Sequence, residues 1–431
     1  MIQAVVNAFK LPDLRRKIIF TMVMLIIYRL AAHVPVPGIN AAALRQLFDS
    51  SQLLGLLDIF SGGAMSNFSV MAMGVYPYIT ATIIMQLLQP LIPQLDELAK
   101  EGEEGRNKLN RISHLLTIPL AALSGFGQAS LLKQQGIMPN FGFTAEHWLV
   151  TLSTIATLTA GTILAVWWGE LISEQGIGNG VSIIIFGGIV ARIPQTVGRN
   201  MISNPWTLLP FLVVTLITVL VIVVVQEGQR RIPVQYGKRV LAMRGNRLRI
   251  AGGQSTHIPI RVNTAGMIPL IFAQSIMLFP GTIASYFVYS SVKIVADVAT
   301  FATKAFSPQG SVYWVMYFFM VVGFTFFYTD VVFRQQNLPD VLQRQGGFIP
   351  GIRPGKKTEE YLNAVLQRIT LVGALFLAGV AILPWLVRDV TETGSMLITS
   401  TGLLIVVGVV LDTMKQLEAQ LLMRHYEGFI K

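Results

Sequence analysis

The chain has 431 residues, of which 53% are hydrophobic and 13% charged, and its formal net charge is +11. The charged fraction is far below the roughly one-quarter found in soluble domains, and it predicts a protein that crosses a membrane several times. The absence of cysteine excludes disulfides, thiolate metal sites and cysteine nucleophiles, and the five histidines share no metal-ligand spacing.

Ten apolar runs, each bounded by charge, Gly or Pro, predict ten membrane-spanning helices and an all-α polytopic fold. The first run follows a basic segment but no small-residue cleavage site comes after it, so we interpret it as a retained span rather than a signal peptide. Ten spans divide into two halves of inverted orientation, residues 1–193 and 194–431, around a central path. The runs lie at about 18–32, 70–92, 114–132, 148–168, 178–193, 207–226, 263–289, 312–333, 364–387 and 396–411.

The segment before the second span, residues 53–67, is apolar but too short to cross the bilayer, and Gly62 and Gly63 interrupt it. Two interpretations are open: a short helix tucked inside the helix bundle, or a loop lying on the membrane surface. From Phe68 to Ile92 there is no charged residue, so this stretch is predicted to cross the membrane as a helix.

The distribution of basic residues predicts that both termini are cytoplasmic, because 25 of the 33 Lys and Arg residues then lie on the cytoplasmic side. Two of the cytoplasmic loops, 227–261 and 334–363, are long, basic and rich in Gly and Pro, which is typical of functional loops. In the first loop, Val-Gln-Tyr and Leu-Arg-Ile alternate like short strands and predict a basic hairpin.

The sequence contains no Walker loop, HExxH, GxSxG or paired carboxylates, so we expect no enzyme activity, no catalytic residues, no cofactor and no metal. Ionisable side chains are nearly absent from the spans, which argues against a proton-coupled transporter. The polar groups inside the spans are amides and hydroxyls, among them Thr80, Gln86 and Asn179, whose plainer role is to hydrogen-bond neighbouring helices.

Branched apolar residues form i, i+4 pairs in two spans, Val75 with Ile79 and Val181 with Ile185. Ordinary core packing is one interpretation of such pairs. The other is a hydrophobic constriction that excludes hydrated ions yet deforms around a passing chain.

Seven motifs, in this order along the chain, carry a family resemblance: RLAAHVPVPGIN (29–40), GVYPYITATIIMQLL (74–88), GIGNGVSIIIFGGIVA (176–191), GQRRIPVQYGKR (228–239), GGQSTHIPIRVNTAGMIPLIFA (252–273), GGFIPGIRPGKKT (346–358) and LDTMKQLEAQLLMRHYEGF (411–429). They resemble the SecY family of bacterial protein-translocation channels over nearly the whole chain. The resemblance implies a channel subunit that passes unfolded secretory chains and releases signal sequences and membrane segments into lipid. It also implies SecE and SecG as channel subunits, SecA and the translating ribosome as partners, and the bacterial inner membrane as location.

The same resemblance implies roles for individual positions. Spans two, three, seven and eight match a lateral gate, with Thr80, Gln86 and Asn179 as its polar residues. Arg353 matches an arginine needed for work with the motor, and Lys238 and Arg239 match contacts to motor or ribosome. The pore ring is matched by Val75, Ile79, Val181, Ile185, Ile271 and Ile405. The plug is matched by Leu57, Asp58, Ile59, Phe60, Ser61, Gly62, Gly63, Ala64, Met65, Ser66 and Asn67.

Overall fold

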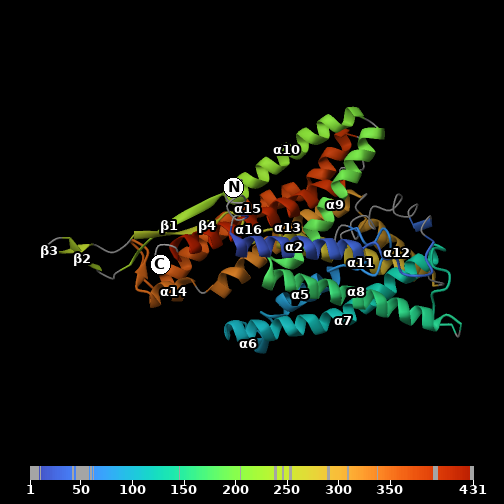
Figure 1. Ribbon diagram of the computed structural model, residues 1–431, viewed down its shortest axis with the longest axis horizontal. Coiled ribbons are helices and arrows are strands. Elements are labelled where there is room, and N and C mark those ends of the chain that lie inside the picture. Colours follow the sequence, from blue (N-terminus) through green and yellow to red (C-terminus); the bar gives the residue numbers. More distant parts are fainter. Residues whose placement is uncertain are drawn as a thin grey trace. The chain divides into compact units, whose positions relative to one another are not determined.

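The fold is a set of membrane-length helices with a small β-sheet inserted into its second half (Figure 1). A computed structural model describes residues 9, 11–40, 43–44, 58, 61, 63–144, 146–203, 205–236, 240–244, 247–251, 255–288, 292–307, 310–336, 338–391 and 397–427. The helices are α2 (Pro12–Ala31), α5 (Tyr76–Leu88), α6 (Pro93–Lys100), α7 (Glu103–Gln134), α8 (Trp148–Gln175), α9 (Gly180–Ser203), α10 (Pro205–Glu227), α11 (Ile268–Phe287), α12 (Lys293–Ala305), α13 (Ser311–Gln336), α14 (Leu338–Arg344), α15 (Lys356–Thr391) and α16 (Leu397–Glu427). The strands are β1 (Gln229–Tyr236), β2 (Val240–Arg244), β3 (Arg247–Ala251), β4 (Ser255–Arg261) and β5 (Gly347–Phe348).

The chain forms two compact units. The larger unit contains Met1–Leu216, Gln274–Met316 and Leu383–Lys431, and the sheet unit contains Ile217–Ala273 and Tyr317–Ile382. The boundaries between them fall within α10, α11, α13 and α15. The larger unit combines segments from both halves of the sequence, so the division into inverted halves at residue 193 stays a prediction.

Each of the ten predicted apolar runs overlaps a helix. Within the described ranges, four helices are long and apolar enough to cross a membrane: Glu103–Lys133, Trp148–Gln175, Ser311–Arg344 and Lys356–Leu383. Shorter apolar helices are found at Tyr76–Leu88, Gly180–Ala191, Thr215–Glu227 and Ile268–Met277. The structure therefore supports several spans, while the count of ten remains a prediction.

The second predicted span is wrong in its extent. Instead of a helix from about residue 68, the chain makes turns through Val75, and α5 has only 13 residues. Pro77 in the first turn of α5 favours a helix start at that point, since proline lacks a backbone donor. Phe68 and Gly74 adopt positive φ values of 40° and 51°, which interrupt any helix running through them.

Glycines let the helices of the larger unit approach closely. Helices α5, α7 and α8 lie side by side, α2 contacts α8 and α9, and α16 contacts α9 (Figure 1). A Cβ added to Gly180 of α9 would lie 1.8 Å from the Gly169 carbonyl oxygen of α8. Small residues of this kind are what allow membrane helices to pack by van der Waals contact.

The basic hairpin is predicted correctly in its strands but not in their pairing, because Val-Gln-Tyr lies in β1 and Leu-Arg-Ile in β3, and these two strands belong to separate sheets. Strand β1 pairs antiparallel with β4 and, on its other edge, with β5, giving the order β4-β1-β5, while β2 and β3 form the tip of the loop. Along β1, Ile232 and Val234 are buried and Arg231, Pro233 and Gln235 are exposed, the two-residue period of a half-buried strand.

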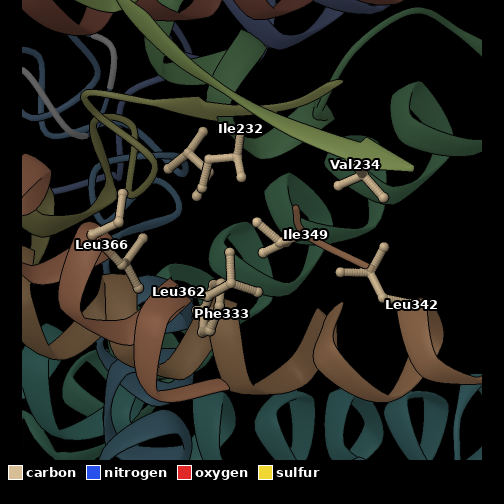
Figure 2. Close-up of a cluster of buried hydrophobic side chains, with 9 residues drawn as sticks. Ile232, Val234, Phe333, Leu342, Ile349, Leu362 and Leu366 are labelled. Carbon is tan, nitrogen blue, oxygen red and sulfur yellow. The ribbon is translucent and has the colours of Figure 1, made fainter. Parts of the chain in front are cut away.

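The buried face of this sheet packs on α13, α14 and α15 through a hydrophobic cluster (Figure 2). Figure 2 shows side chains from the strands directed at those from the helices. Because β5 and α14 come from residues 334–363, the cluster joins the two predicted cytoplasmic loops into one folded body. Its buried members are Ile232, Val234, Ile260, Phe333, Leu342, Ile349, Leu362, Val365 and Leu366.

Candidate functional site

The described part of the predicted plug is a hydrogen-bonded turn segment. The Asp58 carboxylate Oδ1 accepts from the Ser66 backbone N–H at 2.9 Å and from the Ser61 hydroxyl at 3.3 Å. The Ser61 hydroxyl in turn accepts from the Met65 N–H at 3.0 Å, and the Ser66 hydroxyl donates to the Gly63 carbonyl at 3.0 Å. Side chains thus satisfy backbone groups that a helix would otherwise pair, which lets turns exist away from water.

Two contacts attach this segment to the rest of the larger unit. The Tyr28 hydroxyl of α2 donates to the Ser61 carbonyl at 2.9 Å, and the tyrosine side chain is buried. Residues 34–36 form a short ladder with residues 68–70, in which Val36 N–H donates to the Phe68 carbonyl and Val70 N–H to the Val34 carbonyl, both at 3.0 Å. The segment also passes close to α8, where a Cβ on Gly161 would lie 1.9 Å from the Val70 carbonyl oxygen.

Burial favours an internal location over the membrane surface for the described part of residues 53–67, although turns and not a helix make up most of it. Asp58, Ser61, Ala64 and Met65 are at most 1% exposed, so they lie inside the larger unit and not on a membrane surface. The predicted break is present at Gly63, whose φ of 87° suits glycine. Leu57, Ile59, Phe60 and Gly62 lie outside the described residues.

The predicted ring residues are buried or half-buried. In the larger unit, Val75 precedes α5 and Ile79 lies in its first turns, while Ile185 of α9 and Ile405 of α16 lie on helices that contact each other. Val181 is half-buried and its Cγ2 lies 3.0 Å from where a Cβ on Gly169 would be, so it takes part in the packing of α8 on α9.

Ile271 of α11 is the ring candidate that belongs to the sheet unit, where it is buried. The next residue, Phe272, points about 100° away around α11, and its ring makes edge contacts with Phe324 and Tyr328 of α13 at 6.2 and 5.8 Å between centroids. The assignment of the six residues to one ring stays a prediction.

The predicted gate polar residues behave differently from one another. Asn179 caps α9, because its Oδ1 accepts from the Ser182 N–H at 3.1 Å. The Thr80 hydroxyl donates to the Tyr76 carbonyl at 3.1 Å within α5. The side-chain oxygen Oε1 of Gln86 is buried and has no hydrogen-bond partner among the described residues. Gln86 is therefore the residue of this set with an unused hydrogen-bond acceptor.

One polar contact in the larger unit was not predicted. His114 Nε2 of α7 lies 2.8 Å from Glu170 Oε1 of α8, and the Tyr78 ring of α5 packs edge-on to the imidazole at 5.2 Å. The signal available was that His114 and Glu170 fall at the predicted cytoplasmic ends of two consecutive spans, which antiparallel helices bring to one level. The contact ties three neighbouring helices together.

Arg353 lies exposed in the turn between β5 and α15 of the sheet unit. Gly351 and Gly355 flank it with φ values of 84° and 100°, and the buried Thr358 hydroxyl donates to its carbonyl at 3.0 Å. The chain therefore makes a tight turn at Arg353 and exposes this basic side chain. Lys238 and Arg239 lie outside the described residues.

A polar cavity of about 390 Å³ lies between α13 and α15 in the sheet unit. Its wall includes the ion pair of Asp330 and Arg334, 2.9 Å between Oδ2 and Nε, and the amides of Asn363 and Gln367. The buried Thr329 hydroxyl in this wall has no hydrogen-bond partner within the described ranges. Over those same ranges, no group of three or more His, Asp or Glu residues is placed to hold a metal ion.

These features define a membrane protein of many apolar helices, with a turn segment buried among them and a folded module built around a small β-sheet. The family model of SecY matches residues 69–414. The chain belongs to the SecY family.

Relatives of similar length support this membership. The chain is 42% identical to the protein translocase subunit SecY of Halalkalibacterium halodurans over 446 residues, covering 100% of both chains. It is also 42% identical to the SecY subunit of Thermotoga maritima over 445 residues, covering 100% of this chain and 98% of the relative.

Solved structures show the same fold. A SecY structure, described for a plug domain that stabilises the closed state of the translocation channel, matches with a TM-score of 0.60 and 17% identity over 96% of each chain. The Sec61 channel in a canine ribosome-channel complex from the endoplasmic reticulum matches with a TM-score of 0.57 and 16% identity over 96% of each chain.

Proposed function

We propose that this chain is a passive protein-conducting channel that passes unfolded secretory polypeptides across the bacterial plasma membrane. The observation that carries the proposal is a turn segment that is held by hydrogen bonds between its own residues and is buried inside a bundle of apolar helices, in a chain of the SecY family. A buried segment of this kind suits a removable stopper, because irregular backbone at membrane depth is tolerated only where protein or a cavity satisfies it.

The seal is assigned to Val75, Ile79, Val181, Ile185, Ile271 and Ile405 together with the plug at 57–67. Branched aliphatic side chains offer no ligand to a hydrated ion, so a narrow ring of them blocks ions by dewetting. The same side chains bind no particular sequence, which suits a path for unrelated polypeptides. The plug adds a second barrier while no chain occupies the path.

Release into lipid is assigned to a gate formed by the second, third, seventh and eighth spans, which correspond to α5, α7, α11 and α13. Gln86 is the best polar candidate of this gate, because the buried side-chain oxygen Oε1 has no hydrogen-bond partner among the described residues. A polar atom with unused capacity is free to hydrogen-bond a passing backbone. Thr80 and Asn179 are the other polar residues assigned to the gate, and Asn179 Oδ1 also caps α9.

Energy comes from partners at the cytoplasmic face, since the sequence holds no nucleotide-binding motif. We assign the exposed Arg353 to the SecA motor and Lys238 with Arg239 to motor or ribosome, because basic loops attract acidic surfaces and RNA phosphates. SecE and SecG complete the channel, and both termini lie in the cytoplasm in accordance with the basic loops.

A crosslink to a chain in transit tests passage. The protein has no cysteine, so a single Ile79→Cys substitution gives one thiol. A secretory chain that carries one cysteine and is arrested during export should form a disulfide with this thiol. Ile26→Cys is the matched control, because Ile26 is exposed on the outer face of α2 and should not crosslink. Equal crosslinking at both positions would contradict a path along α5.

The rival function is a membrane scaffold without a pore. Deletion of residues 57–67 separates the two, because a channel that loses its plug should conduct ions in a planar bilayer at rest. A scaffold should stay silent after the same deletion. A silent recording from a chain that still assembles with its partner subunits would favour the scaffold.

A further inference from the structure

Helix α12, in the connection between α11 and α13, leaves a bulky apolar stripe uncovered. Ile294, Val298 and Phe301 recur at i, i+4 and i+7 and so share one face. They are 76%, 63% and 74% exposed, values in the range of the most exposed hydrophobic side chains of the chain. We expect another molecule to cover this apolar stripe, because three bulky apolar side chains exposed to water on one helix face are unfavourable.

The opposite side of α12 is its buried side. Ala299 is 5% exposed, and Ala296, Thr300 and Thr303 beside it are half-buried. The two threonine hydroxyls donate to carbonyls of their own helix at 2.7 and 2.8 Å, so this face is small and internally satisfied. The helix is therefore held against the protein by its small residues, with its bulky residues directed away.

A charged stripe separates these two faces. Lys293, Asp297 and Lys304 fall within about 40° of one another around the helix axis, next to Phe301 on the apolar stripe. Two lysines, one at each end of the helix, and one aspartate give this stripe a net positive charge. An apolar stripe bordered by lysines is the pattern of a helix that lies in the plane of a membrane interface, with ammonium groups at the level of lipid phosphates.

The chain also keeps α12 at the membrane surface. Five residues, 288–292, connect it to α11 and five, 306–310, connect it to α13, so either connection reaches at most about 17 Å. Exposed apolar side chains begin in the first turns of α13, where Val312 and Val315 are more than half exposed. A helix tied this closely to the end of a span lies within reach of the headgroup layer.

We infer that α12 is an interfacial helix whose apolar stripe inserts into the lipid headgroup region and whose lysines bind anionic lipid phosphates. The occupant is the bilayer, and the inference rests on membrane residence and not on passage of a chain. One consequence rests on the proposed function: α12 would hold the connected ends of two gate helices at a fixed depth, so that they move along the membrane plane.

The test uses the full cysteine-free chain in proteoliposomes. An environment-sensitive fluorophore is attached to Val298→Cys on the apolar stripe or, as matched control one residue away, to Asp297→Cys on the charged stripe. Vesicles of phosphatidylcholine and phosphatidylglycerol are prepared with and without brominated acyl chains. We expect quenching by brominated lipid at position 298 to exceed that at 297 by about twofold or more, since an interfacial helix buries its apolar face about 5–10 Å deep. Phe301→Cys repeats the measurement where the first variant assembles poorly.

The outcomes are distinct. A label at 298 that is unquenched and as solvent-exposed as the label at 297 overturns the inference. A label at 298 that is shielded from water but unquenched by brominated lipid also overturns it and assigns the stripe to a protein partner or a second copy of the chain. Lys293→Gln with Lys304→Gln should reduce quenching only in vesicles that contain phosphatidylglycerol, and an equal reduction in phosphatidylcholine alone would contradict the anionic-lipid contact. None of these readings changes with channel activity.

Discussion

The hydroxyl of Tyr28 offers the sharpest test of the plug. Tyr28→Phe keeps the ring, which packs edge-on to Trp168 at 6.3 Å between centroids, and deletes only the 2.9 Å hydrogen bond to the Ser61 carbonyl. That carbonyl also accepts from the Ala64 N–H at 3.3 Å, so the substitution does not leave it without a donor. The loss is therefore near the net value of one hydrogen bond, about 1 kcal/mol.

A weakening of this size shifts the resting equilibrium between plugged and unplugged channels. Because 1.4 kcal/mol corresponds to about tenfold, a loss of about 1 kcal/mol should raise the unplugged population about fivefold. The measurement is ion conductance of the reconstituted channel in a planar bilayer without substrate. The mean resting current should rise by the same factor, while the current of a single fully open channel stays unchanged.

The control variants separate this account from general loosening of the bundle. Tyr78→Phe removes the same atom from another tyrosine of the larger unit, one that packs on His114, and should leave the resting current unchanged. In a chain that lacks residues 57–67, Tyr28→Phe should add nothing. An unchanged resting current in the single variant, or an equal increase in the plug-deleted chain, would refute the reasoning.

Three other predictions follow from close contacts. Gly180→Ala should lower the thermal midpoint in detergent, because the new Cβ meets a backbone carbonyl of α8, whereas Gly198→Ala in the same helix has no neighbour within 4 Å and should be neutral. Asn179→Ala should destabilise α9 by about 1 kcal/mol in chemical unfolding, because the helix loses its N-cap, whereas Asn179→Ser should retain most of that stability. An equal export defect in both variants would instead favour a gate role for Asn179. Arg353→Glu should abolish motor-driven export but not membrane insertion. Thr358→Val removes the hydrogen bond to the Arg353 carbonyl and should reduce the same export step, while Thr358→Ser keeps the bond and should preserve export.

Much of the fold is predictable from sequence because hydropathy alone locates spans. Each apolar run overlaps a helix, and the alternation of Val-Gln-Tyr at residues 234–236 predicts the last part of β1. The failure at Phe68–Val75 has a physical cause: its residues are apolar in turns and in helices alike, so hydropathy cannot separate the two. The positive φ values of Phe68 and Gly74 and the close approach of Val70 to Gly161 are incompatible with a helix here, and they depend on the tertiary structure.

The candidate site is less predictable because its key contacts join residues distant in sequence. Neither local pattern nor spacing links Tyr28 to Ser61, and a two-residue strand such as β5 carries no periodicity. For His114 and Glu170 the span pattern predicts that they lie at one level, but not that they form a pair. Asn179 is the reverse case, since an Asn directly before a helix is a capping signal that local sequence already contained. The polar character that suggested a gate role is used, at least in part, for the cap.

Under the proposed function the buried segment from Asp58 to Ser66 is part of a plug, and its hydrogen bonds then determine how the plug moves. The hydrogen bonds among Asp58, Ser61, Met65 and Ser66 span at most eight residues, so they persist when the segment is displaced as a body. The Tyr28 bond spans 33 residues and breaks on displacement, whereas the ladder of residues 34–36 with 68–70 holds the far end in place as a pivot. Opening then costs tertiary contacts and not the internal structure of the segment. A free-energy gap made of a few such contacts is small enough for the binding of an apolar signal sequence to overcome, because a ligand shifts an equilibrium by its differential affinity for the two states.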